Sequence, residues 1–342
     1  MPAVNSGLVL VTGASGFVGT YAVKALLDAG FSVRGTVRSA QKGEHLKELS
    51  PKASYVIVED MSKTGAYDEA VVGVDAVVHV ASPLDTTNEG DPNNVIGPAV
   101  AGVTGILHSL EKNNPKAKRI VDISSVAAVG RAGVAGPGKR TEADWNNEIV
   151  DLCDKLGAAA PGGAKYSASK TVAEKAFWSF LEEKKPAFDG VVLNPGLIFG
   201  PPTQFTAAGG AIVGSNASAL PFMRPGVPTA TLEQPTVDIV DVRDVAAAIV
   251  AGVTTPAAGG ERFIIAAAPL FYNDFAVAAA QVLPEAGVNA NADPAYRAGL
   301  VAKAMVFDGS KATRVLGLNY RDKDATLLET VQALSAKQKA SV

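Results

Sequence analysis

Short apolar runs alternate with helix-like segments along the first 200 residues of this chain. Runs rich in Val and Ile are typical of strands, and apolar residues at helical spacing between them indicate helices. The predicted strands cover residues 7–13, 31–38, 53–60, 74–82, 117–125 and 188–200. The predicted helices cover residues 17–30, 41–50, 66–73, 94–113 and 162–178. Because such alternation is typical of parallel strands joined by right-handed crossovers, we predict a doubly wound α/β fold, with helices on both faces of a parallel sheet.

The pattern changes after residue 200. Residues 201–235 are rich in Pro, Gly and Ala, whereas residues 236–253 resume a strand and a helix and residues 261–268 add another strand. The C-terminal segment that follows has a mixed, largely helical pattern. We therefore predict a sheet domain and a smaller C-terminal lobe that closes over the edge of the sheet. The sheet domain comprises residues 1–200 and 236–265, and the lobe comprises residues 201–235 and 266–342.

Charge, cysteine and histidine content argue against several classes of protein. The formal net charge is −3 and no block of Lys or Arg stands out, so we expect no nucleic acid partner. The N-terminus lacks the pattern of a signal peptide and no apolar run reaches the length of a membrane span, so we expect a cytoplasmic protein without a membrane contact. A single cysteine, Cys153, excludes an internal disulfide. The three histidines, His45, His79 and His108, are too scattered along the sequence to predict a metal site.

Three glycines, Gly13, Gly16 and Gly19, lie between the first predicted strand and its helix. In the Rossmann fold, glycines at this place permit a tight turn, let the backbone approach a pyrophosphate and let the helix pack close to the strand. The free N–H groups at the start of the helix then face the phosphates. The alternative is a tight turn without a ligand. We predict a Rossmann sheet that binds a dinucleotide through a loop comprising Gly13, Ser15, Gly16, Phe17, Val18 and Gly19.

The second predicted strand lacks the acidic residue that usually holds the ribose 2′-hydroxyl in NAD-binding proteins. Gly35 and Thr36 occupy its place, and three cations, Arg34, Arg38 and Lys42, lie nearby. Because cations suit a 2′-phosphate, we predict that the cofactor is NADP(H), held first by Arg38 and second by Lys42. Ordinary surface basicity is the alternative.

Tyr166 and Lys170 stand four residues apart in a stretch dominated by Ala, Lys and Glu and free of proline. On a helix, residues at this spacing lie one above the other on one face. Such a pair is either a catalytic dyad or a contact between solvated side chains. The spacing alone leaves both interpretations open.

Five motifs occur in order along the chain: TGASGFVG, VVHVASP, ISSVAAVG, YSASK and NPGLIFGP. Together they resemble the extended short-chain dehydrogenases/reductases, and the resemblance spans the sheet domain from residue 7 to about 265. Within that family the chain resembles the dihydroflavonol-reductase-like branch. The stretches GAYDEAV, PAVAGVTGILHSL, AEKAFWSFLEE and RDVA are similar to those of fungal NADPH-dependent aldehyde and methylglyoxal reductases. The resemblance implies an oxidoreductase that transfers hydride from NADPH to a small aldehyde or ketone.

The family's Ser–Tyr–Lys centre maps onto Ser125, Tyr166 and Lys170, with Ser124 as the alternative serine. Ser125 stands five residues before Gly130, as the family pattern does. A phenol holds its proton tightly at neutral pH, and an ammonium group at about 4 Å favours the phenolate by about 4 kcal/mol at an effective dielectric constant near 20. Tyr166 is therefore the expected proton donor, with Lys170 assisting it. The resemblance also implies that Lys170 holds the nicotinamide ribose and that Ser125 donates a hydrogen bond to the substrate oxygen.

The resemblance implies further cofactor contacts at the ends of three strands. These residues would approach, in turn, the adenine, the ribose and diphosphate, and the nicotinamide carboxamide. They are Asp60 and Met61, Ala81 and Ser82, and Pro195, Gly196 and Leu197. Each is alternatively an ordinary turn residue.

Two positions depart from the family pattern. Ala99 stands where many members carry an asparagine, so no fourth, proton-relaying residue is identified. Asp122 lies in the fifth predicted strand, where an apolar or hydroxyl residue is usual. A buried carboxylate at that position requires a polar partner.

The substrate site is predicted at the junction of the sheet and the lobe, which makes the lobe the substrate-binding part. It would be formed by residues 82–85, 126–131 and 199–205 and the segment that follows. Phe199, Phe205 and Phe222 either make this site apolar or belong to the core. Arg131 either binds an anionic substrate or is a surface residue. A monomer and a homodimer both fit the sequence.

Other functions share this fold. Nucleotide-sugar epimerases and dehydratases usually carry the acidic residue that the second strand lacks here, and they keep NAD bound. Redox-sensing relatives have lost the tyrosine that is present here as Tyr166. Hydroxysteroid dehydrogenases of the same branch differ only in substrate class. The sequence favours an NADPH-dependent carbonyl reductase over these alternatives.

Overall fold

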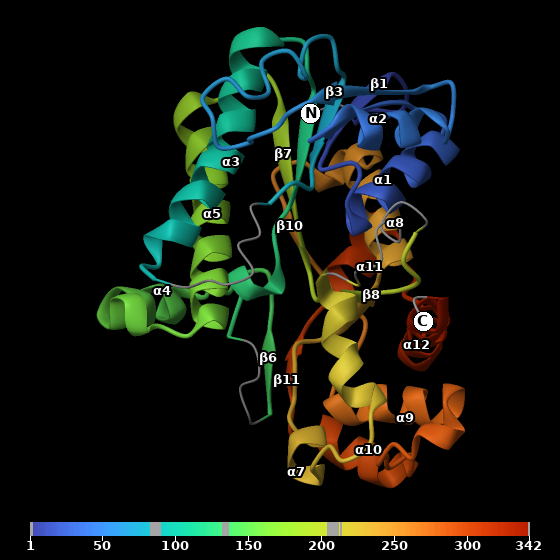
Figure 1. The fold of residues 1–342 in the computed structure, drawn as a ribbon. Helices are drawn as coiled ribbons and strands as arrows, with labels where there is room; N and C mark the ends of the chain where they lie inside the picture. Colours follow the sequence, from blue (N-terminus) through green and yellow to red (C-terminus); the bar gives the residue numbers. More distant parts are fainter. Residues whose placement is uncertain (1–2, 83–89, 132–136, 204–211, 213, 341–342) are drawn as a thin grey trace.

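A seven-stranded parallel sheet forms the centre of the molecule (Figure 1). The structure, a computed structural model, describes residues 3–82, 90–131, 137–203, 212 and 214–340. The strands lie side by side in the order β10 (Arg262–Ile265), β7 (Asp189–Pro195), β5 (Arg119–Ile123), β4 (Ala76–His79), β1 (Leu8–Thr12), β2 (Ser32–Val37) and β3 (Ala53–Ile57). The predicted doubly wound α/β sheet is therefore confirmed.

Two layers of helices cover the sheet (Figure 1). One layer contains α3 (Asn93–Asn113), α5 (Gly162–Lys184) and, outside them, α4 (Asn147–Leu156). The other contains α1 (Phe17–Asp28), α2 (Ala40–Lys47), α8 (Val242–Thr254) and α11 (Ser310–Leu316). Val9 and Val11 of β1 pack in the core on the side of α1, whereas Leu10 between them packs on the side of α3 and α5. Burial on both faces explains why this strand is an unbroken apolar run.

Residues 66–73 form successive turns instead of the predicted helix. Gly65 and Gly73 at the two ends have φ angles of 74° and 72°, so the backbone leaves the right-handed helical region at both ends. A segment this short gains too few helical hydrogen bonds to offset the cost of nucleation. Tyr67, Ala70 and Val71 of the segment are still buried, with Tyr67 only 1% exposed, whereas Val72 is exposed.

The strand predicted at residues 188–200 is divided in two at Gly196. β7 pairs with β10, whereas β8 (Leu197–Phe199) pairs with β9 (Ile239–Asp241) in a separate two-stranded sheet. The Gly196 N–H donates to the carbonyl of Ile265, and the next N–H, of Leu197, donates to the carbonyl of Asp238. A Cβ at residue 196 would lie 2.1 Å from that Asp238 oxygen, so the change of partner requires glycine.

The lobe has a core of its own, in which Phe199, Phe222 and Phe275 pack together. Its elements are η3 (Gly214–Met223), α7 (Thr229–Leu232), α9 (Tyr272–Val282), α10 (Pro294–Val301) and α12 (Lys323–Ala340). A second small sheet pairs β6 (Gly138–Arg140) with β11 (Met305–Phe307).

The two-part division at residues 200, 236 and 265 stays a prediction, and the packing differs from it at α11. Ala312, Leu316 and Leu318, assigned above to the lobe, lie in the core beneath α1 and α8. Within the described part of the chain, no helix combines the length and apolar character needed to cross a membrane.

Candidate active site

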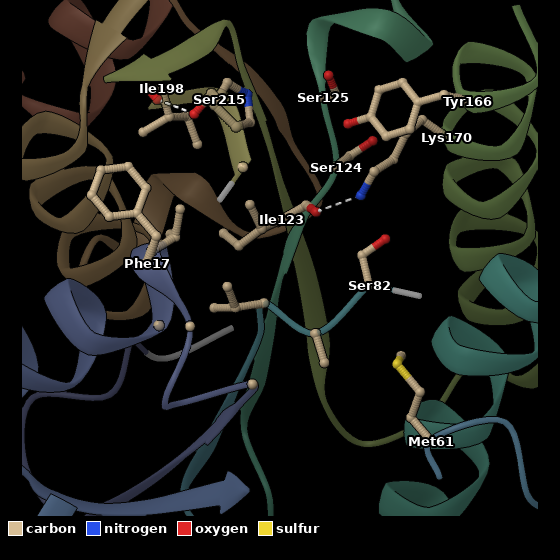
Figure 2. Close-up of a pocket in the computed structure, with 18 of the residues that line it drawn as sticks. Phe17, Met61, Ser82, Ile123, Ser124, Ser125, Tyr166, Lys170, Ile198 and Ser215 are labelled. Atoms are coloured by element: carbon tan, nitrogen blue, oxygen red, sulfur yellow. Dashed lines mark hydrogen bonds between the residues drawn. The ribbon is translucent and has the colours of Figure 1, made fainter. Parts of the chain in front are cut away.

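A cavity of about 900 Å³ lies at the carboxyl ends of the parallel strands, bordered by both the sheet and the lobe. Figure 2 shows part of its lining. The structure brings every cofactor-binding and catalytic residue predicted above to this one cavity. They are Gly13, Ser15, Gly16, Phe17, Val18, Gly19, Arg38, Lys42, Asp60, Met61, Ala81, Ser82, Ser125, Tyr166, Lys170, Pro195 and Leu197. Their roles in binding and catalysis stay predictions.

The glycine loop turns tightly from β1 into α1. Gly13 has a φ of 64°, a left-handed conformation that favours glycine. A Cβ at Gly19 would lie 2.1 Å from the carbonyl oxygen of Gly13, so only glycine lets the first turn of α1 approach the loop this closely. The helix begins at Phe17 without a side-chain cap, which leaves N–H groups at its start for a ligand. The loop therefore fits a phosphate group.

Two observations explain why β2 carries no acidic residue. A Cβ at Gly35 would lie 2.5–2.6 Å from side-chain carbons of Leu46 and Ala14, so no larger side chain fits there. Thr36 uses its hydroxyl to accept a hydrogen bond from the N–H of Gly13, at 3.1 Å. Both positions thus serve the packing of the glycine loop.

The three cations near β2 separate in the structure. Arg34 turns away from the cavity and donates to the carbonyl oxygens of Ala70 and Val72, at 2.9 and 2.7 Å. Arg38 and Lys42 are exposed at the cavity and form no ion pair within the described ranges of the chain. They are therefore available to an anion.

Asp60 follows β3 and is exposed. Its carboxylate accepts hydrogen bonds from the Ser62 hydroxyl at 2.6 Å and from the Ser62 N–H at 3.0 Å, and these bonds lower the pKa of Asp60. The side chain is thus held as an anion at the rim of the cavity, where the adenine was predicted to lie.

Helix α5 carries Tyr166 and Lys170 toward the end of β5. The Nζ of Lys170 donates to the carbonyl oxygen of Ile123 at 3.4 Å, and Figure 2 shows the hydroxyls of Tyr166 and Ser125 directed into the same part of the cavity. Ser125 begins the short helix η1 (Val126–Ala128), and its Oγ accepts a hydrogen bond from the N–H of Ala127 at 3.1 Å. That bond leaves the hydroxyl proton of Ser125 available for another acceptor.

The structure distinguishes Ser125 from Ser124, the alternative serine. Ser124 is buried, and its hydroxyl donates to Oε2 of Glu174 at 2.6 Å. Its proton is therefore already used, whereas no residue in the described part of the chain accepts the proton of Ser125. The geometry thus favours Ser125 as the serine that contacts a substrate.

Buried polar groups lie beneath Lys170 on the same face of the sheet. Thr12 Oγ1 accepts the N–H groups of Val80 and Ala81, so its own proton goes to Nδ1 of His79, at 3.0 Å. His79 is therefore neutral, with its proton on Nε2. Burial, with a smaller effect from the charge of Lys170, lowers the pKa of His79 to about 3.

Asp122 lies beside His79 in the sheet, and it is 4% exposed. Burial raises the pKa of Asp122 to about 7; the charge of Lys170 opposes this effect and that of Glu174 adds to it. Ala99, at the position where an asparagine was expected, is buried in the core under α3. Neither observation identifies a fourth catalytic residue.

For three of the residues considered for the substrate pocket, the structure favours the structural alternative. Phe199 and Phe222 belong to the core of the lobe, and Arg131 is exposed outside the cavity lining. Phe205 and residues 83–85 lie outside the described residues.

The lobe contributes Gly214 and Ser215 to the lining, and both lie in the variable segment after residue 205 that was expected at the substrate site. The sequence did not single out two further lining residues, Ile198 and Val237. Ser215 donates to the carbonyl oxygen of Ile198, which joins the start of η3 to β8 (Figure 2). Ile198 and Val237 are ordinary apolar residues of strand-like stretches, so no residue-type signal marks them as lining a site.

Within the described residues, no three His, Cys, Asp or Glu side chains come together in a group that could hold a metal ion. The lining of the cavity includes hydroxyl-bearing side chains, the ammonium group of Lys170 and the backbone at the start of α1.

The sequence from residue 9 to residue 266 matches the NAD dependent epimerase/dehydratase family. The chain belongs to this family. The predicted resemblance to the extended short-chain dehydrogenases/reductases is thereby confirmed.

Named relatives and a solved structure resemble most of the chain. A putative NADPH-dependent methylglyoxal reductase of Candida albicans is 35% identical over 279 residues, which are 78% of this chain and 80% of the relative. A ketoreductase of Aspergillus niger is 32% identical over 95% of this chain and 97% of its own. The structure of a yeast methylglyoxal/isovaleraldehyde reductase complexed with NADPH superimposes with a TM-score of 0.85 at 29% identity, and it covers 97% of this chain and 99% of that one.

Proposed function

We propose that this protein is an NADPH-dependent carbonyl reductase, which converts a small aldehyde or ketone to an alcohol. The observation that carries the proposal is that one cavity is lined both by a glycine loop at a helix N-terminus and by Ser125, Tyr166 and Lys170. The names of the relatives, a methylglyoxal reductase and a ketoreductase, support this activity. The NADPH in the yeast reductase structure supports the choice of cofactor.

The residues of the cavity fit NADP(H). The tight glycine loop offers N–H groups to the diphosphate, and Arg38 and Lys42 offer unpaired positive charge to the 2′-phosphate. The other proposed contacts are Asp60 and Met61 with the adenine, Ala81 and Ser82 with the ribose and diphosphate, Lys170 with the nicotinamide ribose, and Pro195 and Leu197 with the carboxamide. When bound, NADPH supplies the hydride that the carbonyl carbon accepts.

Tyr166 is the proposed proton donor. As the carbonyl becomes an alcohol, the phenol gives its proton to the carbonyl oxygen. Ser125 donates a hydrogen bond to the same oxygen and stabilises the negative charge that develops there. Lys170, one helical turn from Tyr166, stabilises the phenolate that remains.

The partner we propose is thus a small-molecule carbonyl compound. We propose further that the protein works in the cytoplasm as a monomer or a homodimer, which the sequence allows equally.

Consumption of NADPH by the purified protein tests the activity. Methylglyoxal, an aryl aldehyde, a β-keto ester, a dihydroflavonol and a steroid ketone cover the substrate classes of related enzymes, with NADH in parallel. We expect turnover with NADPH on at least one of the aldehydes or ketones. If the protein binds NADPH but consumes none with any of these compounds, the proposal is contradicted.

Tyr166→Phe tests the role of the proton donor. The change removes only a hydroxyl, so we expect kcat to fall by about 10²- to 10⁴-fold, the usual contribution of a general acid. The Kd for NADPH, measured by the fluorescence of the bound nucleotide, should stay nearly unchanged. A variant that retains most of its activity would refute the assignment.

A further inference from the structure

Glu174 is a buried carboxylate near the proposed active site that has no part in the proposed chemistry. It is 1% exposed and lies on α5 one turn beyond Lys170. Its Oε2 accepts hydrogen bonds from the Ser124 hydroxyl and from Nδ2 of Asn194, each at 2.6 Å. Its Oε1 accepts Nε of Arg262 at 2.5 Å. Side chains from β7, from β10 and from the residue that follows β5 therefore meet at one carboxylate on α5.

The partners of Glu174 hold the backbone on both sides of the peptide bond between Ser124 and Ser125. Ser124, directly before Ser125, is fixed by its own hydroxyl. Nδ2 of Asn194 also donates to the carbonyl oxygen of Ser125, at 3.1 Å. Two of the three donors to Glu174, Ser124 and Asn194, thus connect the end of β5 to α5.

Arg262 extends the same network to the segment after Ser125. Its Nη1 donates to the carbonyl oxygens of Glu142 and Asp144, at 2.8 and 3.0 Å, and its guanidinium group lies 3.7 Å from the centre of the Trp145 ring. The adjacent residue, Asn146, donates through Nδ2 to the carbonyl oxygen of Ala127, at 2.8 Å.

The N–H of Asn146 donates to the carbonyl oxygen of Ala128, at 2.9 Å. The two hydrogen bonds from Asn146 therefore hold helix η1, which has Ser125 at its N-terminus. Ser125 thus lies between contacts made by Glu174 and contacts of the segment that Arg262 binds, and Glu174 and Arg262 pair with each other.

We propose that Glu174 is a positioning residue that fixes Ser125 relative to Tyr166 and Lys170, an inference that rests on the proposed function. Tyr166, Lys170 and Glu174 lie on α5 at intervals of four residues, so they share one face of the helix. The carboxylate of Glu174 therefore links the end of β5, where Ser125 lies, to the helix face that carries Tyr166 and Lys170. A buried ion pair adds little net stability over apolar residues of similar size. The ion pair contributes here by fixing the geometry of the site, because a displacement of about 1 Å at a reacting group lowers the rate by about 10²-fold.

Glu174→Gln is the main test. Glutamine has the size of glutamate but offers one oxygen and one NH₂ group, so it cannot accept hydrogen bonds from all three donors. We expect kcat to fall by about 10- to 100-fold. The Kd for NADPH should change by no more than about twofold, because none of the proposed cofactor contacts hydrogen-bonds to Glu174.

Asp189→Asn provides the matched control. Asp189 begins β7 and accepts Nε and Nη2 of Arg119, which begins β5, at 2.7 and 2.8 Å. This is a second carboxylate–arginine pair between strands of the same sheet, with Arg119 buried and Asp189 11% exposed, and it lies at the ends of β5 and β7 remote from the cavity. We expect Asp189→Asn to lower the melting temperature and to leave kcat within about twofold of wild type.

Ser124→Ala covers the case in which Glu174→Gln does not fold. It removes one donor and leaves the pair of Glu174 with Arg262 in place, and we expect kcat to fall while the Kd for NADPH holds. If wild type is active and both variants are as active as Asp189→Asn, the inference is overturned and the proposed function stands. If wild type binds NADPH but reduces no carbonyl compound, the proposed function falls and the inference falls with it.

Discussion

Asp122 is an ionisable group buried in the central sheet. It lies on the α5 face of β5, beside His79 of β4, and Lys170 and Glu174 face it from α5. Burial outweighs the attraction of Lys170, so the pKa of the carboxyl is raised to about 7. The group is therefore protonated in the folded protein under mildly acidic conditions, and this state avoids the cost of a buried charge.

The stability of the protein should fall as Asp122 ionises. An unfolded aspartate has a pKa near 3.9, so between about pH 4 and pH 7 the unfolded state loses a proton that the folded state keeps. The contribution of this carboxyl to the free energy of unfolding is fully present below about pH 4, and it decreases by up to about 1.4 kcal/mol per pH unit until pH 7. Asp122→Asn cannot ionise, so its melting temperature should decrease less than that of wild type between pH 5 and pH 8.

The difference between the melting temperatures of wild type and Asp122→Asn reports on the Asp122 carboxyl alone. His79, whose pKa is lowered to about 3, and Asp238, whose pKa burial raises to about 7, are present in both. Equal pH dependence of the two melting temperatures would show that Asp122 does not titrate as proposed.

At the scale of elements, the glycine loop and α1 show how closely a ligand site can depend on backbone shape. The loop can turn because Gly13 adopts a positive φ, and α1 can approach it because Gly19 has no side chain. Thr36 in β2 accepts the N–H of Gly13, so the neighbouring strand also fixes the loop. Packing between β1, α1 and β2 thus decides the shape of the proposed phosphate site.

Gly19→Ala should disrupt this element and its ligand together. The new Cβ would lie 2.1 Å from the Gly13 oxygen, so the loop must move. We expect a loss of about 1–3 kcal/mol in the free energy of unfolding and a weaker affinity for NADPH, measured by denaturant titration and by nucleotide fluorescence.

Gly105→Ala serves as the control for this prediction. Gly105 lies within α3, where a Cβ meets no atom within 4 Å, so alanine should stabilise the protein by about 0.5–1 kcal/mol without changing nucleotide affinity. If both variants bind NADPH like wild type, the close approach at Gly19 does not shape the site.

At the scale of the whole molecule, the cavity joins the sheet domain to the lobe. Its lining includes Ile198, Ser215 and Val237 beside the glycine loop and α5. A dinucleotide bound there contacts residues that are far apart in the sequence and that meet only in the folded chain. Binding should therefore stabilise the fold as a unit.

NADPH should raise the melting temperature, and Arg38 should decide its advantage over NADH. At a concentration 100 times its Kd, a ligand adds about 2.7 kcal/mol to stability, which corresponds to a shift of ~5 °C in a chain of this size. We expect a larger shift with NADPH than with equimolar NADH. Arg38→Asp should reverse that order, because an acidic group repels the 2′-phosphate and can accept the 2′-hydroxyl. If Arg38→Asp still prefers NADPH, the role of Arg38 is contradicted. Arg38→Lys is the control, and it should retain the preference for NADPH.

The sequence by itself predicted the parallel sheet, because β-branched runs and glycine-terminated helices are local signals of strands and helices. Tyr166 and Lys170 could be paired because four residues make about one helical turn. The expected site residues that follow strands came from the family resemblance of the motifs, and they meet in the structure because the carboxyl ends of parallel strands lie at one edge of the sheet. The sheet and the Tyr166–Lys170 pair thus rest on spacing within single elements and on fixed rules of connection.

Only the tertiary structure decided the features that depend on contacts between distant residues. The break at Gly196 follows from the oxygen of Asp238, and the packing of α11 under α8 follows from the shape of the sheet-domain core. The hydrogen bond that occupies the Ser124 hydroxyl depends on Glu174, which lies fifty residues further along the chain. Ser215 and Val237 come to the same cavity as the glycine loop only in the folded chain. Folding brings such residues together through packing between whole elements, and the spacing of residues along the sequence does not specify that packing.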